Sequence, residues 1–260
     1  MLIYLKRNTY ISVGAMSKAV DDLALARKLQ SGRLAVLTTS QLSAALGLNI
    51  ASARVRLNRL VRRGVLARLS RGRYCLPAAG PLAVASGFYQ PSYVSLAAAF
   101  EFHGTSTQST NMIDVVNPVR SGQTTIRLDS GRFIVRFVKV GHRLMYGFLR
   151  VFQNGSAANV AEKERAVVDT LLLPGRAPLD EAFACIRSGV DASKAMEYAR
   201  RTRRQAVVKR LGFLLSRAGL EPGPSAAGRL SPTYVPLDPA LPRRGAFDRR
   251  WRIIVNRVVE

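Results

Sequence analysis

The feature that most limits the fold of this chain is a long segment without acidic residues. The 78 positions between Asp22 and Glu101 contain 11 Lys or Arg and no Asp or Glu. A solvated protein surface usually mixes charges of both signs, because like charges repel and ion pairs between neighbours are weakly favourable. A segment of a single sign therefore predicts a fold whose exposed face meets a polyanion, with nucleic acid as the first candidate.

The whole chain shares this bias and is nevertheless able to fold. Its 260 residues hold 40 Lys and Arg against 16 Asp and Glu, a formal net charge of +24, and arginine outnumbers lysine by 33 to 7. Arginine is suited to planar, bidentate recognition of phosphate and guanine. Hydrophobic residues make up 48% of the chain, so hydrophobic cores can form and a disordered polycation is excluded.

The sequence argues against a membrane protein, a secreted protein and a disulfide-rich protein. No apolar run approaches the roughly 20 residues of a membrane helix, and the first residues lack the apolar stretch and cleavage site of a signal peptide. Cys75 and Cys185 are the only cysteines and lie far apart. We expect a soluble, cytoplasmic protein with no disulfide framework and no membrane partner.

The N-terminal part carries the start and stop signals of three helices and a hairpin. Ser, Thr or Asn stands where each helix would begin, and Gly follows the second and third helices. The order helix, helix, turn, helix and basic hairpin predicts a winged helix-turn-helix over residues 1–80. The expected elements are a helix from Ser17 to about Gln30, a helix Gln41–Leu46 after Thr39 or Ser40, a helix from Ile50 to about Arg63 after Asn49, and a hairpin over Val65–Leu76 that turns at Arg71-Gly72.

The third helix separates its residues into two faces at about 100° per residue. An apolar stripe is expected to pack inward, consisting of Ile50, Ala53, Leu57, Leu60 and Val61. The opposite face is free to enter a major groove, where N-terminal residues of a recognition helix reach base edges. The predicted base-reading residues are Ser52, Val55, Arg56 and Arg59, with Arg54 on the flank, and the predicted phosphate contacts are Arg62, Arg63, Arg68, Arg71 and Arg73. An arginine-rich solvated helix in a protein-interaction module is the alternative interpretation.

Residues 81–260 are expected to form a mixed α/β domain, which makes the predicted fold class α+β. A Pro/Gly/Ser-rich stretch over residues 77–92 marks the expected boundary. The expected elements are helices over 93–104, 158–172, 178–188 and 191–219, strands over 112–116, 123–128, 132–138 and 144–151, and a closing strand over 251–256.

A second basic run lies in the C-terminal part. Arg200, Arg201, Arg203 and Arg204 are clustered there, and no acid occurs between Tyr198 and Leu220. These arginines could extend a DNA contact, bind RNA, face an acidic partner or form a solvated half-helix. The sequence leaves these alternatives open.

In its order of motifs the chain resembles the AbiEi family of antitoxins from toxin–antitoxin and abortive-infection systems. The resemblance rests on the winged helix followed by short motifs in a fixed order. These motifs are Tyr93-Val94-Ser95-Leu96 with His103-Gly104, Ala161-Glu162-Lys163 before Ala166-Val167-Val168-Asp169, the helix Ala206–Leu215, Leu237-Asp238-Pro239, and Trp251–Asn256. Glu164 departs from the small residue expected after Glu-Lys, and residues 224–232 have no clear counterpart.

The resemblance implies a protein with two activities. In the family, the winged helix binds inverted repeats upstream of its own operon and represses it, and the C-terminal domain is required for antitoxicity. The implied partners are double-stranded operator DNA and a nucleotidyltransferase-like toxin of the AbiEii type, with which no stable complex is needed.

The sequence lacks the residue patterns of an enzyme. His103 and His142 each lie next to a glycine, and neither they nor the two cysteines have metal-ligand spacing. Phosphate-binding loops of the GxxxxGK[ST] or GxGxxG type are absent. We therefore expect no catalytic site, no metal and no cofactor. The alternative function is a nonspecific nucleic-acid-binding protein, or a metal-dependent nuclease that would have to take its carboxylates from the middle of the chain. Asp114 with Glu162-Lys163 does not supply the Asp and Glu-x-Lys pattern of such a nuclease.

Overall fold

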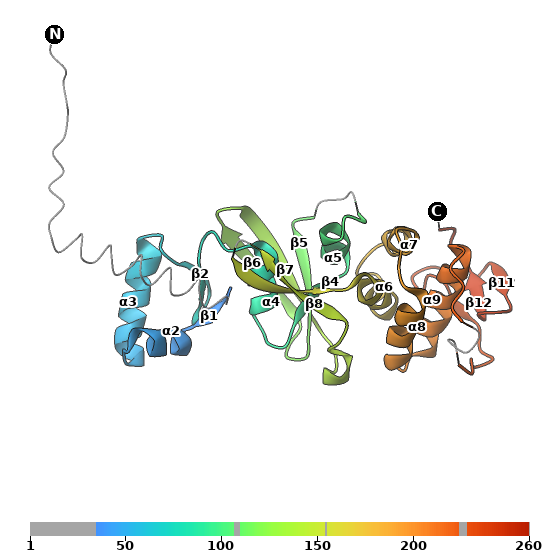
Figure 1. Ribbon diagram of the computed structural model, residues 1–260, viewed down its shortest axis with the longest axis horizontal. Coiled ribbons are helices and arrows are strands. Elements are labelled where there is room, and N and C mark those ends of the chain that lie inside the picture. Colours follow the sequence, from blue (N-terminus) through green and yellow to red (C-terminus); the bar gives the residue numbers. More distant parts are fainter. Residues whose placement is uncertain (1–34, 107–109, 154, 224–227, 260) are drawn as a thin grey trace, which may run out of the picture.

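The protein is described here by a computed structural model that covers residues 35–106, 110–153, 155–223 and 228–259. Within these residues the fold is mixed α/β, with eight α-helices and three sheets. The elements follow one another along an elongated molecule (Figure 1), from α2 and α3 at one end, through a six-stranded sheet, to α8, α9 and β12 at the other end. The helix expected from Ser17 to about Gln30 lies outside the described residues.

At the N-terminal end, two helices pack against a small antiparallel sheet of order β1-β3-β2. These elements are β1 (Leu37–Thr38), α2 (Thr39–Leu46), α3 (Ile50–Arg62), β2 (Ala67–Ser70) and β3 (Arg73–Cys75). The second helix, the third helix and the hairpin expected from the sequence are therefore confirmed, including the turn at Arg71-Gly72.

The caps of these helices explain where the helices begin. Thr38, and not Thr39 or Ser40 as expected, caps α2 through a capping box with Gln41, whose side chain accepts the backbone N–H of Thr38 at 2.8 Å. Asn49 caps α3 as predicted, by accepting the backbone N–H of Ser52 at 2.9 Å. Gly47 follows α2 in the left-handed region, with φ 62°.

A small hydrophobic core fixes α3 against the sheet. Its buried members are Leu37, Leu42, Leu57, Leu60, Leu66 and Tyr74. Within the predicted apolar stripe of α3, Ala53, Leu57 and Leu60 are buried and Val61 is half-buried. Ile50, at the start of the helix, is 41% exposed, so the stripe begins one turn later than expected.

The central sheet has the strand order β6-β7-β5-β4-β9-β8. The pairs β5–β7 and β4–β9 are parallel and the other pairs are antiparallel. The strands are β4 (Tyr93–Ser95), β5 (Met112–Asn117), β6 (Gly122–Leu128), β7 (Gly131–Lys139), β8 (Phe148–Gln153) and β9 (Ser156–Ala161).

Two expected helices are wrong in part, because each begins with a strand of this sheet. Residues 93–104 form β4 and then the short helix α5 (Ala97–Phe102), and residues 158–172 form the end of β9 and then α6 (Lys163–Leu172). Both strands lie in the middle of the sheet. Buried strands have apolar residues on both faces and lack the period-two alternation that marks a half-exposed strand.

Two further segments also differ from expectation. Residues 77–92, expected to be a boundary stretch, contain the helix α4 (Pro81–Gly87), which begins with Pro81 in its first turn and packs against β9. The strand expected over residues 144–151 is confirmed only from Phe148 on, where β8 begins; a 3₁₀ turn, His142–Leu144, ends where the strand was expected to start.

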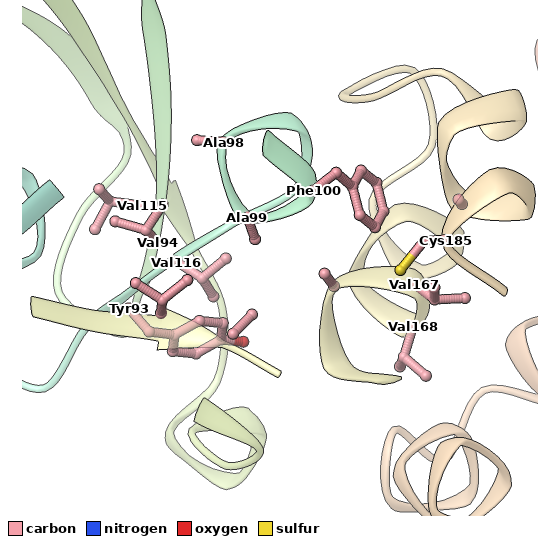
Figure 2. Close-up of a cluster of buried hydrophobic side chains, with 14 of the residues drawn as sticks. Tyr93, Val94, Ala98, Ala99, Phe100, Val115, Val116, Val167, Val168 and Cys185 are labelled. Carbon is pink, nitrogen blue, oxygen red and sulfur yellow. The ribbon is translucent and has the colours of Figure 1, made fainter. Parts of the chain in front are cut away.

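Four helices and a small sheet complete the C-terminal end. They are α6, α7 (Leu179–Arg187), α8 (Ala192–Arg201) and α9 (Gln205–Arg217), followed by β10 (Val235–Pro236), β11 (Ala246–Asp248) and β12 (Ile253–Val255) in the order β10-β12-β11. Helix α5 lies between the sheet and this end (Figure 2). Phe100 extends from α5 toward Val167 of α6 and Cys185 of α7, while Ala98 faces the side of Val115.

A buried polar cluster joins α6 to the sheet. Arg165 and Asp169, both 0% exposed, form an ion pair of 2.7 Å within α6. Asp169 also accepts the hydroxyl protons of Tyr93 at 3.1 Å and Ser95 at 2.8 Å, and Arg165 donates to the Tyr93 oxygen at 3.0 Å. Burial and the adjacent Asp169 raise the pKa of Tyr93 well above its ordinary value, so the phenol stays neutral.

We predict that Asp169→Ala lowers the free energy of unfolding by about 3–5 kcal/mol, because it leaves the Arg165 charge buried without a counter-ion. Urea denaturation followed by circular dichroism measures this loss. Asp129→Ala is the matched control, since Asp129 is exposed and its removal should change stability by no more than about 0.5 kcal/mol. Equal losses in both variants would show that the pair does not carry the predicted role.

The C-terminal sheet is held to α9 by the only tryptophan in the chain. The indole N–H of Trp251 donates to the hydroxyl oxygen of Ser216 at 3.0 Å. The ring covers Gly212 so closely that a Cβ atom at that position would overlap its six-membered ring. Gly212 is therefore required by packing in the interior of a helix where alanine would otherwise be favoured by about 1 kcal/mol.

We expect Gly212→Ala to destabilise the protein by about 2 kcal/mol or more, because the added methyl group displaces the indole. Thermal unfolding followed by tryptophan fluorescence should show a lower Tm together with a shifted native emission maximum. Gly141→Ala is the control, since nothing lies within 4 Å of a Cβ built there. An unchanged Tm in Gly212→Ala would contradict the close packing.

Candidate nucleic-acid interface

The exposed face of α3 carries the predicted DNA-contacting residues. Arg54, Arg59 and Arg62 are exposed and Arg56 is half-buried. Among the described residues, no carboxylate pairs with Arg54, Arg56 or Arg59. Arg59 and Arg62 lie in the last turn of the helix, where a cation also interacts favourably with the helix dipole. This part of the molecule therefore presents positive charge that no described carboxylate neutralises.

The N-terminal half of α3 adds smaller side chains to the same face. Ser52 is exposed, and Val55 is 53% exposed, although the other side of the helix is packed into the core. A valine in this position is able to contact a thymine methyl group, and a serine is able to contact several base edges. Arg63, the C-cap of α3, is also exposed.

A basic notch lies between α3 and the hairpin. This cavity of about 270 Å³ is lined by Thr39, Arg54, Asn58, Arg68, Arg71, Gly72 and Tyr74. The first residue of α2 holds the hairpin turn in place, because the Thr39 N–H donates to the Gly72 carbonyl at 3.0 Å. Three guanidinium groups, one from the helix and two from the hairpin, thus surround a concave site without an acid among its lining residues. Such an arrangement favours binding of an anion.

Arg73 occupies a different environment from the other predicted contacts. Its Nε donates to the Phe88 carbonyl at 3.2 Å, and its guanidinium lies 4.8 Å from the centre of the Tyr89 ring. Close by, Val36 and Gly87 are in such close contact that a Cβ on Gly87 would lie 2.9 Å from Val36. Arg73 therefore helps to join the hairpin to the segment after α4, a contact that depends on residues remote from the hairpin sequence.

The second basic cluster lies at the other end of the molecule. Arg200 and Arg201 end α8, Arg203 has φ 58°, and Arg204 caps α9; all four are exposed. Figure 1 places α8 and α9 far from α3, so these arginines do not continue the α3 surface. Arg201 also packs over the ring of Tyr146, with its guanidinium carbon 3.7 Å from the ring centre.

His103 is hydrogen-bonded and the two cysteines are buried, whereas His142 is exposed. The His103 ring lies 2.7 Å from the Ala161 carbonyl through Nε2, and burial raises the pKa of the Cys75 thiol to about 12. The described part of the chain holds no group of three or more His, Cys, Asp or Glu that could bind a metal ion. Within that same part, none of the helices is long and apolar enough to span a membrane.

Comparison with known proteins agrees with the resemblance seen in the sequence. Residues 22–77 match the family model described as "Transcriptional regulator, AbiEi antitoxin". This AbiEi match confirms the predicted resemblance for the segment that holds α2, α3 and the hairpin, and it indicates a transcriptional regulator of the antitoxin type. All ten predicted DNA-contacting residues lie within it. The search of curated proteins gives no match.

The fold extends the comparison beyond the AbiEi segment. The crystal structure of the RV2827C protein from Mycobacterium tuberculosis is similar with a TM-score of 0.56 at 14% sequence identity, over 88% of this chain and 89% of that one. At this identity the likeness concerns the fold alone.

We predict that Arg73→Met lowers the free energy of unfolding by about 1–2 kcal/mol, because a hydrogen bond and a cation–π contact are lost together. Arg71→Met, two residues away, removes the same charge from an exposed side chain and should change stability by at most about 0.5 kcal/mol. Chemical denaturation of both variants makes the comparison. The assignment fails if the two variants have the same stability.

Proposed function

We propose that this protein is a DNA-binding transcriptional autorepressor and antitoxin of a toxin–antitoxin operon. The observation that carries the proposal is the uninterrupted basic surface of α3 and the hairpin, within the segment that matches the AbiEi regulators. In this proposal the helix expected from Ser17 to about Gln30 completes a winged helix-turn-helix over residues 1–80, and residues 81–260 form the antitoxin domain.

Helix α3 enters the major groove and reads the operator. The exposure of Ser52 and Val55 in its N-terminal half supports base contacts there. We assign base contacts also to the half-buried Arg56 and to the exposed Arg59 in the last turn. The remaining basic side chains contact phosphates, which position the protein without reading sequence. Those side chains are Arg62, Arg63, and the three arginines of the notch, Arg54, Arg68 and Arg71.

Arg73 is also among the predicted phosphate contacts, and its position between the hairpin and the segment after α4 gives it a second role. Its side chain is half-buried and contacts Phe88 and Tyr89. We assign it the role of holding the hairpin in the orientation in which Arg68 and Arg71 reach the DNA backbone.

The operator and the toxin are the proposed partners. Repression through inverted repeats places two copies of the chain on one DNA site, with a half-site spacing set by the helical repeat. The proposed toxin is a nucleotidyltransferase-like protein of the AbiEii type, counteracted by the C-terminal domain. No catalytic role, metal or cofactor is included in this function.

The net charge of +24 supports a second candidate, a nonspecific nucleic-acid-binding protein. A surface of this charge attracts any polyanion by releasing counterions, whatever its sequence. One titration separates the two candidates.

We expect the protein to bind a duplex taken from upstream of its own gene at least about 10³-fold more tightly than a scrambled duplex of equal length. Fluorescence anisotropy at several salt concentrations gives both affinities and both salt slopes. If both duplexes bind with one affinity that falls with one slope, the protein is the nonspecific binder.

We expect substitutions of base-contacting and phosphate-contacting arginines to affect DNA binding differently. Arg56→Ala and Arg59→Ala are expected to weaken binding to the upstream duplex by about 1–3 kcal/mol each and to reduce discrimination. Arg71→Met is expected to weaken binding to both duplexes equally and to lower the salt dependence of binding, the slope of log K against log[salt], by about 1. Arg187→Ala, an exposed arginine at the end of α7, is the control and should leave binding unchanged.

A further inference from the structure

A cavity of about 410 Å³ lies at the C-terminal end of the molecule. Its walls come from the loop between α6 and α7, from α9, and from the segment that follows β10. Figure 1 places these elements at the end opposite α3, so the cavity is separate from the proposed DNA interface.

A buried arginine faces this cavity with most of its hydrogen-bonding capacity unused. Arg210 of α9 is only 8% exposed, and its Nε donates to the Pro236 carbonyl at 2.9 Å. Within the described residues, its two terminal amino groups have no hydrogen-bond partner. A guanidinium carries five N–H donors, so the side chain is held in place by one donor and offers the others to the cavity.

The one acidic residue in the cavity wall is already satisfied by other groups. Asp238 accepts hydrogen bonds from Arg257 at 2.8 Å and from the Ala240 N–H at 2.9 Å, one on each carboxylate oxygen. Burial alone would raise the pKa of Asp238, but these two hydrogen bonds hold it below its ordinary value. Asp238 therefore remains ionised and bonded to Arg257, and it forms no hydrogen bond to Arg210.

The wall of the cavity carries more positive than negative charge. Arg176, Arg210 and Arg257 line the cavity against the single acid Asp238, and Arg257 has a second ion pair with Asp180 at 2.6 Å. Arg257 is thus neutralised by its own carboxylates. Arg176 and Arg210 form no ion pair within the described residues. For Arg210, burial lowers the pKa, and the charge of the nearby Asp238 opposes this effect only in part.

Most of the remaining wall is apolar and includes Leu171, Leu179, Leu237, Pro178 and Pro239. A concave site of this size that combines an apolar lining with a few convergent charged groups is typical of a small-ligand site. Two guanidinium groups that form no ion pair within the described residues match the charge of about −1.5 to −2 that a phosphate monoester carries at pH 7. A carboxylate supplies only half of that charge.

We propose that this cavity binds a small organic phosphate monoester of the size of a mononucleotide. The phosphate lies between Arg210 and Arg176, and the organic part lies against the leucines and prolines. The site stands independently of the DNA-binding proposal, because it shares no residue with the α3 surface.

Isothermal titration calorimetry of the full chain, at an ionic strength of about 0.15 M, tests the site with AMP, CMP and ribose 5-phosphate. Adenosine and inorganic phosphate are the comparison ligands. We expect one-site binding of at least one monoester, no binding of adenosine, and weaker binding of inorganic phosphate. The proposal is overturned if none of the three monoesters binds, or if inorganic phosphate binds as tightly as the best of them.

Matched variants separate the cavity from the general positive charge of the protein. Arg210→Met should lower the affinity for the bound monoester at least tenfold. Arg217→Met, which removes an exposed arginine from the same helix, should leave that affinity unchanged. Ala240→Trp narrows the cavity without altering charge and should also abolish binding, with circular dichroism confirming that the variant is folded. Equal effects of Arg210→Met and Arg217→Met, or full binding in Ala240→Trp, would locate the ligand outside the cavity. DNA affinity should be the same in all three variants.

Discussion

The ion pair between Arg165 and Asp169 is the interaction on which the arrangement of sheet and helices depends. Both residues belong to α6 and both are fully buried, and their other partners, Tyr93 and Ser95, belong to the central strand β4. Removing two charges from water costs several kcal/mol for each ion. The cost is offset only when the pair and its hydrogen-bonding partners meet in one geometry, so the cluster disfavours alternative packings of α6 on the sheet.

The ring of Tyr146 connects this buried cluster to the second basic cluster, because it contacts an arginine of each. The Arg165 guanidinium lies 4.3 Å from the centre of the Tyr146 ring, and Arg201 lies 3.7 Å from it. The Tyr146 hydroxyl donates to the Tyr198 carbonyl in α8 at 2.8 Å. Arg201 is consequently a packing residue as well as an exposed cation. Charge alone, as seen in the sequence, does not distinguish these two uses of an arginine.

The parts of the fold that could be predicted are those specified by residues close to one another in the sequence. The cap at Asn49, the glycine after α2 and the amphipathic pattern of α3 act within a few residues, and the structure has α3 where they indicate it. Strands β4 and β9 were missed because their environment is non-local: each lies between two other strands, and their buried pattern resembles that of a helix core. The contact of Arg73 with the segment after α4 and the position of Arg210 in the cavity wall could not be predicted from the sequence, for a related reason. The partner of Arg73 lies 15 residues away and that of Arg210 lies 26 residues away, and no periodic pattern connects them.

Several ion pairs compensate arginines in the later part of the chain. Four arginines of the later part of the chain pair with carboxylates from the same part: Arg136 with Asp114, Arg165 with Asp169, Arg250 with Glu221, and Arg257 with Asp180 and Asp238. Residues 35–100 contain no carboxylate to do the same for Arg54, Arg56 or Arg59. In an elongated molecule with α3 at one end, the N-terminal end therefore carries exposed arginines without carboxylates of their own region, and local charge of this kind attracts a polyanion to the surface that carries it. Under the proposed function, the N-terminal end meets the operator first, and α8, α9 and the arginine-lined cavity remain directed away from the DNA and open to their own partners.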